Sequence, residues 1–187
     1  MTFINMQRSD GPLLGHFDQN VKRFLGVKGN DISGSEIMIW LENSQRLIDQ
    51  FRSDSSFYDY TFIVLPAFKA LEKWLLDIAP FLGISTEKIQ VARDLGSFKF
   101  LKEDKIGEIV DEIIEKLNEI DDQRKINLKD SIVSLNSLLK NYRHELAHCS
   151  RTIQNVHQAE DKIATIRERV NSITELLIRE KIITLNN

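Results

Sequence analysis

The stretch that decides the fold is TFIVLPAFKALEKWLLDIAPFL, residues 61–82, in which apolar side chains occupy almost every direction around a helical turn. A helix that is apolar on all sides must be enclosed by other elements. Pro66 either kinks this helix or belongs to its first turn. The few polar side chains share one face, at Lys69, Glu72, Lys73 and Asp77. The stretch therefore predicts a central helix that the rest of the chain buries.

Helical periodicity continues on both sides of this stretch. Upstream, Ser35 can cap a helix with apolar residues at Ile37, Trp40, Leu41, Leu47, Ile48 and Phe51. A short helix is expected between Ser85 and Gly96. Three further stripes alternate between spacings of three and four, at Ile106, Val110, Ile113, Leu117 and Ile120, at Leu128, Ile132, Leu135, Leu139, Tyr142, Leu146 and Cys149, and at Ile163, Ile166, Val170, Ile173 and Leu177. No alternating stretch predicts a strand, so the expected fold class is all-α, an antiparallel helical bundle.

The bulk composition sets the domain organisation and the setting. The chain has 187 residues, enough for one good core, and five of its eight glycines precede residue 35. We therefore expect an irregular segment over residues 1–35 and one helical bundle over 36–187. The single Cys149 excludes an intramolecular disulfide, and no apolar run suits a signal peptide or a membrane span. A cytoplasmic protein without membrane contact is predicted.

The stretch NYRHELAHCS, residues 141–150, carries the candidate chemistry and has two interpretations. As HELAH it matches H-E-x-x-H, in which two histidines hold zinc and the glutamate acts as a base. As RHELAH it places an arginine and a histidine with four residues between them, and this interpretation needs no metal. On a helix, His144 and His148 fall outside the apolar stripe and point away from its core.

The zinc interpretation needs a third ligand. One common continuation of the motif requires glycine and histidine where this chain has Arg151 and Gln154. The other takes a glutamate from a later helix, for which Glu168 is a candidate among many glutamates. Such proteases also bind substrate along an edge strand, and none is predicted. We expect no metal and no cofactor.

The second interpretation resembles a known family. R-x4-H near the end of a helix in a small all-α bundle is similar to the HEPN superfamily of ribonucleases and toxins, with Arg143, His144 and His148 at the matching positions. The helix of residues 61–82, with Glu72 in an apolar run, resembles the HEPN domain of RNase LS-type toxins. The resemblance covers about residues 36–182.

The resemblance implies metal-independent endoribonuclease activity, in which the ribose 2′-hydroxyl attacks the neighbouring phosphorus. His148 would transfer protons near neutral pH, and Arg143 would stabilise the phosphate charge. Glu72 would orient one of them, or else form an ion pair with Lys69 or Lys73. His144 and Arg151 would bind the substrate. His16 and His157 are interpreted as solvated residues.

The family also implies partners. Its members dimerise with the two motif helices facing, which implies a homodimer here and would concentrate positive charge around bound RNA. That point matters because the net charge of −3 disfavours broad non-specific binding of nucleic acid. Many relatives paired with a nucleotidyltransferase antitoxin carry a tyrosine where this chain has Ser150, so a different cognate antitoxin protein is implied. The alternative function is a binding or regulatory bundle of the same fold that cleaves nothing.

Overall fold

A computed structural model describes residues 12–53, 56–95, 98, 103–116, 121–139 and 153–185. Over these ranges all secondary-structure elements are helices, and the only β-type pairing is an isolated bridge between Lys28 and Asp31. The prediction of an all-α fold is confirmed. The elements are η1 (Pro12–His16), α1 (Gln19–Phe24), α2 (Glu36–Phe51), α3 (Thr61–Ile78), α4 (Thr86–Leu95), α5 (Glu103–Lys116), α6 (Asp122–Leu139) and α8 (Val156–Arg179).

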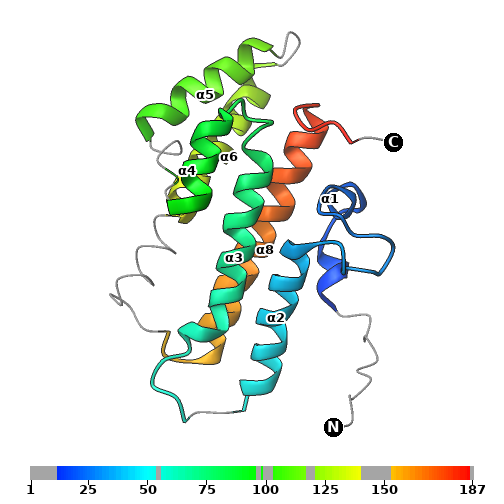
Figure 1. Cartoon of the computed structure of the whole chain (residues 1–187), viewed down its shortest axis with the longest axis vertical. Helices are drawn as coiled ribbons and strands as arrows, with labels where there is room; N and C mark the ends of the chain where they lie inside the picture. Colours follow the sequence, from blue (N-terminus) through cyan, green and yellow to red (C-terminus); the bar gives the residue numbers. More distant parts are fainter. Residues whose placement is uncertain are drawn as a thin grey trace.

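Three long helices, α2, α3 and α8, contact one another and form the centre of the molecule. The sequence colours in Figure 1 show that α2 runs opposite to α3 and α8. As predicted, α3 is central and buries apolar side chains along its length, at Ile63, Val64, Ala67, Ala70, Leu71, Trp74 and Ile78. The burial does not extend to all sides, because Leu65 is 49% exposed. Ser35 caps α2 by accepting a hydrogen bond from the Met38 N–H at 3.3 Å, which places the start of that helix where the sequence predicts it.

Two buried hydrogen bonds join these central helices. The Trp74 indole N–H donates to the Thr174 hydroxyl at 2.9 Å, which links α3 to α8. The Ala67 N–H donates to the buried Ser44 hydroxyl at 2.9 Å, which links α3 to α2. Ala67 follows Pro66, which lies inside α3 beyond its first turn. Polar groups at the centre of this core therefore have partners, as burial requires.

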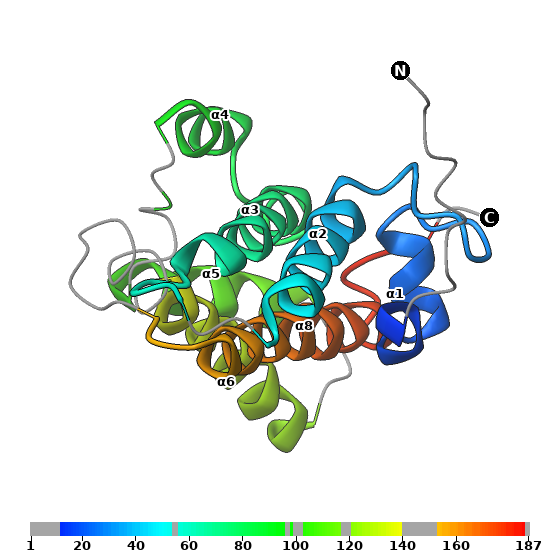
Figure 2. The same cartoon turned by 90° about the horizontal axis from the view of Figure 1, so that it is seen from below.

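The segment before α2 is more ordered than the predicted irregular stretch. η1 and α1 contact α8, and they bring Leu13, Phe17, Val21 and Leu25 into the core. Gly26 has a φ of +80°, and a Cβ added there would lie 3.1 Å from the Gly34 carbonyl oxygen. Glycine at these two positions thus permits the close approach of the backbone in the connection between α1 and α2. Figure 2 shows α1 and α4 on opposite sides of the central helices.

The helices α5 and α6 contact each other, and α6 also contacts α8. Predicted stripe positions in these helices are buried at Val110, Ile113, Leu128, Ile132, Leu135 and Leu139. All five predicted stripe positions of α8 are buried too. Leu117, Ile120, Tyr142, Leu146 and Cys149 lie outside the described residues, as does the side chain of Ile106. Within the described part of the chain, no helix is both long and apolar enough to cross a membrane.

Candidate functional site

The predicted motif falls in a part of the chain that the structure does not describe. Arg143, His144, His148 and Arg151 all lie outside the described residues. Of the predicted site residues, Glu72 alone is described; it is half-buried on α3. Glu72 and the residues on either side of the motif are the described parts of the predicted site.

The two lysines suggested as ion-pair partners of Glu72 each contact another residue. Lys69 places its Nζ 5.6 Å from the centroid of the Trp40 ring, a cation–π arrangement with α2. Lys73 forms an ion pair with Asp77 one turn further along α3 and lies 4.0 Å from Glu36. The polar face predicted for α3 is thus half-buried or exposed and is held partly by contacts with α2.

The chain on each side of the motif is anchored in the core. Leu138 and Leu139 are buried at the end of α6, before the motif. After it, buried Ile153 accepts a hydrogen bond from the Tyr60 N–H at 2.8 Å and donates its own N–H to an Asp59 carboxylate oxygen at 3.3 Å. The residue that follows Arg151 and Thr152 is therefore held at the start of α3.

Asp59 is an acceptor for several donors at this junction. Its carboxylate also accepts hydrogen bonds from the N–H and the hydroxyl of Thr61. Partial burial acts to raise the pKa of Asp59, but the hydrogen bonds from Thr61 and Ile153 hold this pKa below its ordinary value. A charged Asp59 thus supports both the first turn of α3 and the chain that leaves the motif.

A group of aromatic rings lies at the same junction. Phe57 packs edge-on against Phe51 and Tyr60, with centroid separations of 5.4 and 5.9 Å. Phe62 joins this group through contacts with the same rings. Tyr58, next to the group in the sequence, is 97% exposed. This aromatic group was not predicted, although the sequence FYDY at residues 57–60 signals it.

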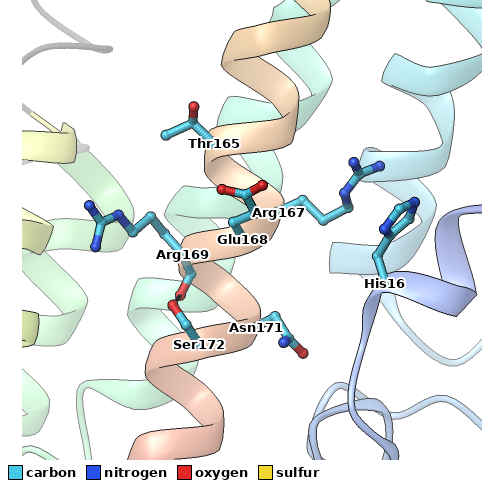
Figure 3. A pocket seen from close by; sticks show the side chains of 7 residues that line it. All are labelled: His16, Thr165, Arg167, Glu168, Arg169, Asn171 and Ser172. Atoms are coloured by element: carbon cyan, nitrogen blue, oxygen red, sulfur yellow. Dashed lines mark hydrogen bonds between the residues drawn. The ribbon is translucent and has the colours of Figure 1, made fainter.

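A cavity of about 500 Å³ lies along α8, and its described lining is entirely polar. Figure 3 shows Arg167 and Asn171 extending from α8 toward His16 of η1, and Arg169 extending the other way. Glu168, a candidate for the third zinc ligand in the sequence analysis, is on this exposed part of α8. The described lining residues are His16, Thr165, Arg167, Glu168, Arg169, Asn171 and Ser172.

Arg167 is the half-buried cation of this cavity. Burial lowers the pKa of its guanidinium from the ordinary value, and the carboxylates of Glu168 and Glu160 act in the opposite direction. The side chain remains charged at neutral pH, because an arginine guanidinium holds its proton far into the alkaline range. Among the described residues, no side chain or carbonyl accepts a hydrogen bond from this guanidinium, and no carboxylate lies within ion-pair distance.

The two histidines left as solvated residues differ in their surroundings. His157 is 83% exposed, with its Nδ1 at 3.7 Å from Glu160. His16 is also exposed, and it lies with Arg167 among the residues that line the cavity. Comparison of the chain with protein-family models, curated proteins and solved structures found no match.

Proposed function

We propose that the chain is a metal-independent endoribonuclease of HEPN type that acts as a toxin or in phage defence. The observation that supports this most directly is the spacing of Arg143 and His148 after the apolar stripe of α6. The stripe is buried at Leu128, Ile132, Leu135 and Leu139. If the helix continues through the motif with the same periodicity, both histidines lie outside the buried face, where a substrate can reach them.

The proposed reaction needs a proton acceptor, a proton donor and charge stabilisation. The 2′-hydroxyl oxygen attacks phosphorus while its proton passes to His148 of one subunit, and the P–O5′ bond breaks. The leaving 5′-oxygen takes a proton from the second His148 of a dimer or from water. Arg143 donates hydrogen bonds to the phosphate oxygens, whose charge increases in the transition state. The products are a 2′,3′-cyclic phosphate and a 5′-hydroxyl.

A homodimer is part of this proposal. On a helix that continues with the periodicity of α6, His144 and His148 would point away from the buried stripe, so a second subunit is the surface proposed to face them. Two motif segments together supply two copies of Arg143, His144 and Arg151 to one RNA strand. This local doubling of positive charge would favour RNA binding at the motif, although each chain has a net charge of −3. Glu72 is proposed as a positioning residue for this site.

The aromatic group at the start of α3 supports an RNA substrate. Bases of single-stranded RNA stack on exposed aromatic rings, and Tyr58 presents such a ring. Asp59, its neighbour, bonds to Ile153, two residues beyond Arg151. A base stacked on Tyr58 would therefore belong to a nucleotide close to the one whose phosphate is cleaved.

Labelled RNA and DNA of one sequence, incubated in EDTA, provide the test. The parent protein should cut the RNA alone and leave cyclic phosphate ends. Arg143→Ala and His148→Ala should each lose about 10² to 10⁴ in rate, which is typical for a group that transfers protons or stabilises the transition state. His157→Ala is the matched control, because His157 is a solvent-exposed histidine outside the motif, and it should retain the parent rate.

Several outcomes contradict the proposal. Cutting of DNA, or cutting that persists in both motif variants, removes the assignment to Arg143 and His148. Loss of activity in EDTA, with about one zinc bound per chain and released by His144→Ala, supports the H-E-x-x-H interpretation instead. If the parent protein binds RNA but cleaves none, the alternative function is supported, in which the bundle binds a partner without cutting it.

A further inference from the structure

We propose that the cavity between α8 and η1 binds the phosphate group of a small phosphate ester. The cavity volume of about 500 Å³ lies in the range of small-molecule sites. Its described lining has no apolar side chain, which suits a strongly hydrophilic ligand. This inference does not depend on RNA cleavage by the motif.

The first reason is the state of Arg167. A half-buried guanidinium loses part of its hydration, and burial is the main influence on its pKa. Glu168 and Glu160 favour the charged form, but neither lies within 4.0 Å of it to form an ion pair. The planar fork of N–H donors thus remains available for two oxygens of one phosphate, the geometry in which arginine binds phosphate best.

The second reason is the orientation of Asn171. Its Oδ1 accepts a hydrogen bond from the Asp18 N–H at 3.0 Å, which assigns the oxygen to that contact. The Nδ2 group is then left as a donor on the cavity side, and the described residues provide no acceptor for it. Figure 3 shows that Arg167, Asn171 and His16 approach the same part of the cavity. Two donor groups and a protonatable ring at one place favour an anion.

The other lining residues project from a different side of α8. Figure 3 shows Thr165, Glu168, Arg169 and Ser172 on the side away from His16. The part of the cavity beside η1 is therefore lined by Arg167, Asn171 and His16, whose donor groups suit a phosphate.

Isothermal titration calorimetry with inorganic phosphate and with ribose 5-phosphate tests the site, in buffers matched in ionic strength with chloride. The parent should bind both, because each presents a phosphate group to Arg167 and Asn171. Arg167→Gln should weaken both by about tenfold or more, since a hydrogen bond to a charged group is lost. Arg46→Gln is the control, because Arg46 is an exposed arginine on α2 and pairs with Glu42.

A second variant separates binding from folding. Asn171→Asp keeps an oxygen for the Asp18 N–H but replaces the amide donor with a negative charge. It should leave thermal unfolding close to that of the parent and weaken phosphate binding by about tenfold or more. The proposal is overturned if the parent binds neither phosphate nor ribose 5-phosphate at millimolar concentration. It is equally overturned if both variants bind like the parent, or if an RNA oligonucleotide without a terminal phosphate displaces ribose 5-phosphate.

Discussion

The junction between α3 and α8 and the junction between α6 and α8 are built in different ways. At the first, Trp74 and Thr174 share a neutral hydrogen bond of 2.9 Å, and both residues are fully buried. At the second, Arg124 of α6 reaches the Glu180 carboxylate at the end of α8, with a closest separation of 3.0 Å. The Glu180 side chain is 2% exposed and the Arg124 side chain 44%. Packing thus dominates the junction between α3 and α8. At the junction between α6 and α8, the half-exposed Arg124 side chain contributes through its ion pair with Glu180.

The largest loss of stability should come from a cavity at the junction between α3 and α8. Trp74→Ala removes a fully buried indole and its hydrogen bond, and it should lower the free energy of unfolding by about 3–5 kcal/mol. Urea unfolding followed by circular dichroism measures this change. Trp40→Ala is the matched control, because Trp40 is only partly buried and stacks under Lys69. Equal losses in the two variants would show that the α3–α8 junction is not the centre of stability.

A smaller effect is expected at the charged junction. Arg124→Gln leaves the buried Glu180 carboxylate with Arg179, whose Nε lies 3.2 Å away. The free energy of unfolding should fall by about 1.5–3 kcal/mol, the value of a hydrogen bond to a charged group. Water can reach the Arg124 side of the pair, which limits the loss to this range. Hydrogen exchange should show faster opening of α6 amides than in the parent, with α3 amides less affected.

Lys125→Gln tests whether charge alone explains that result. Lys125 neighbours Arg124, and its Nζ lies 3.5 Å from the highly exposed Asp122 carboxylate. Exposed pairs of this kind contribute little, so the variant should stay within about 0.5 kcal/mol of the parent. An equal loss for Lys125→Gln and Arg124→Gln would mean that burial of Glu180 does not matter to the junction.

The sequence was informative wherever one helix carries its own pattern. The stripe from Ile163 to Leu177 and the apolar stretch of residues 61–82 predicted buried helices, because helical periodicity depends only on local spacing. Leu13, Phe17, Val21 and Leu25 follow the same spacing of four, yet glycines around them directed the prediction toward an irregular segment. A glycine signals a turn, but the sequence does not reveal that packed residues lie on both sides of it.

Contacts between residues that are far apart in the sequence could not be predicted from local spacing. His16 and Arg167 are far apart in the sequence, and the half-burial of Arg167 depends on how η1 packs beside α8. The bond from Tyr60 to Ile153 also crosses from one helix start to another. For the motif itself, the roles of Arg143 and His148 remain predictions from residue chemistry, since they lie outside the described residues.

An effect smaller than at either helix junction should arise where the chain leaving the motif meets α3. Asp59→Asn removes the charge that accepts hydrogen bonds from Thr61 and Ile153, and Asp59 is largely exposed. Solvent screening should therefore keep the loss below about 1 kcal/mol at neutral pH. Because folding lowers the pKa of Asp59, its contribution is present above the ordinary aspartate pKa of about 4 and is lost as the pH falls through the lower folded value. Unfolding curves of parent and variant should thus differ at neutral pH and converge in acid, whereas Asp130→Asn, at an exposed aspartate of α6, should match the parent throughout. A gap between parent and Asp59→Asn that widens in acid would show that the charge of Asp59 does not stabilise this junction.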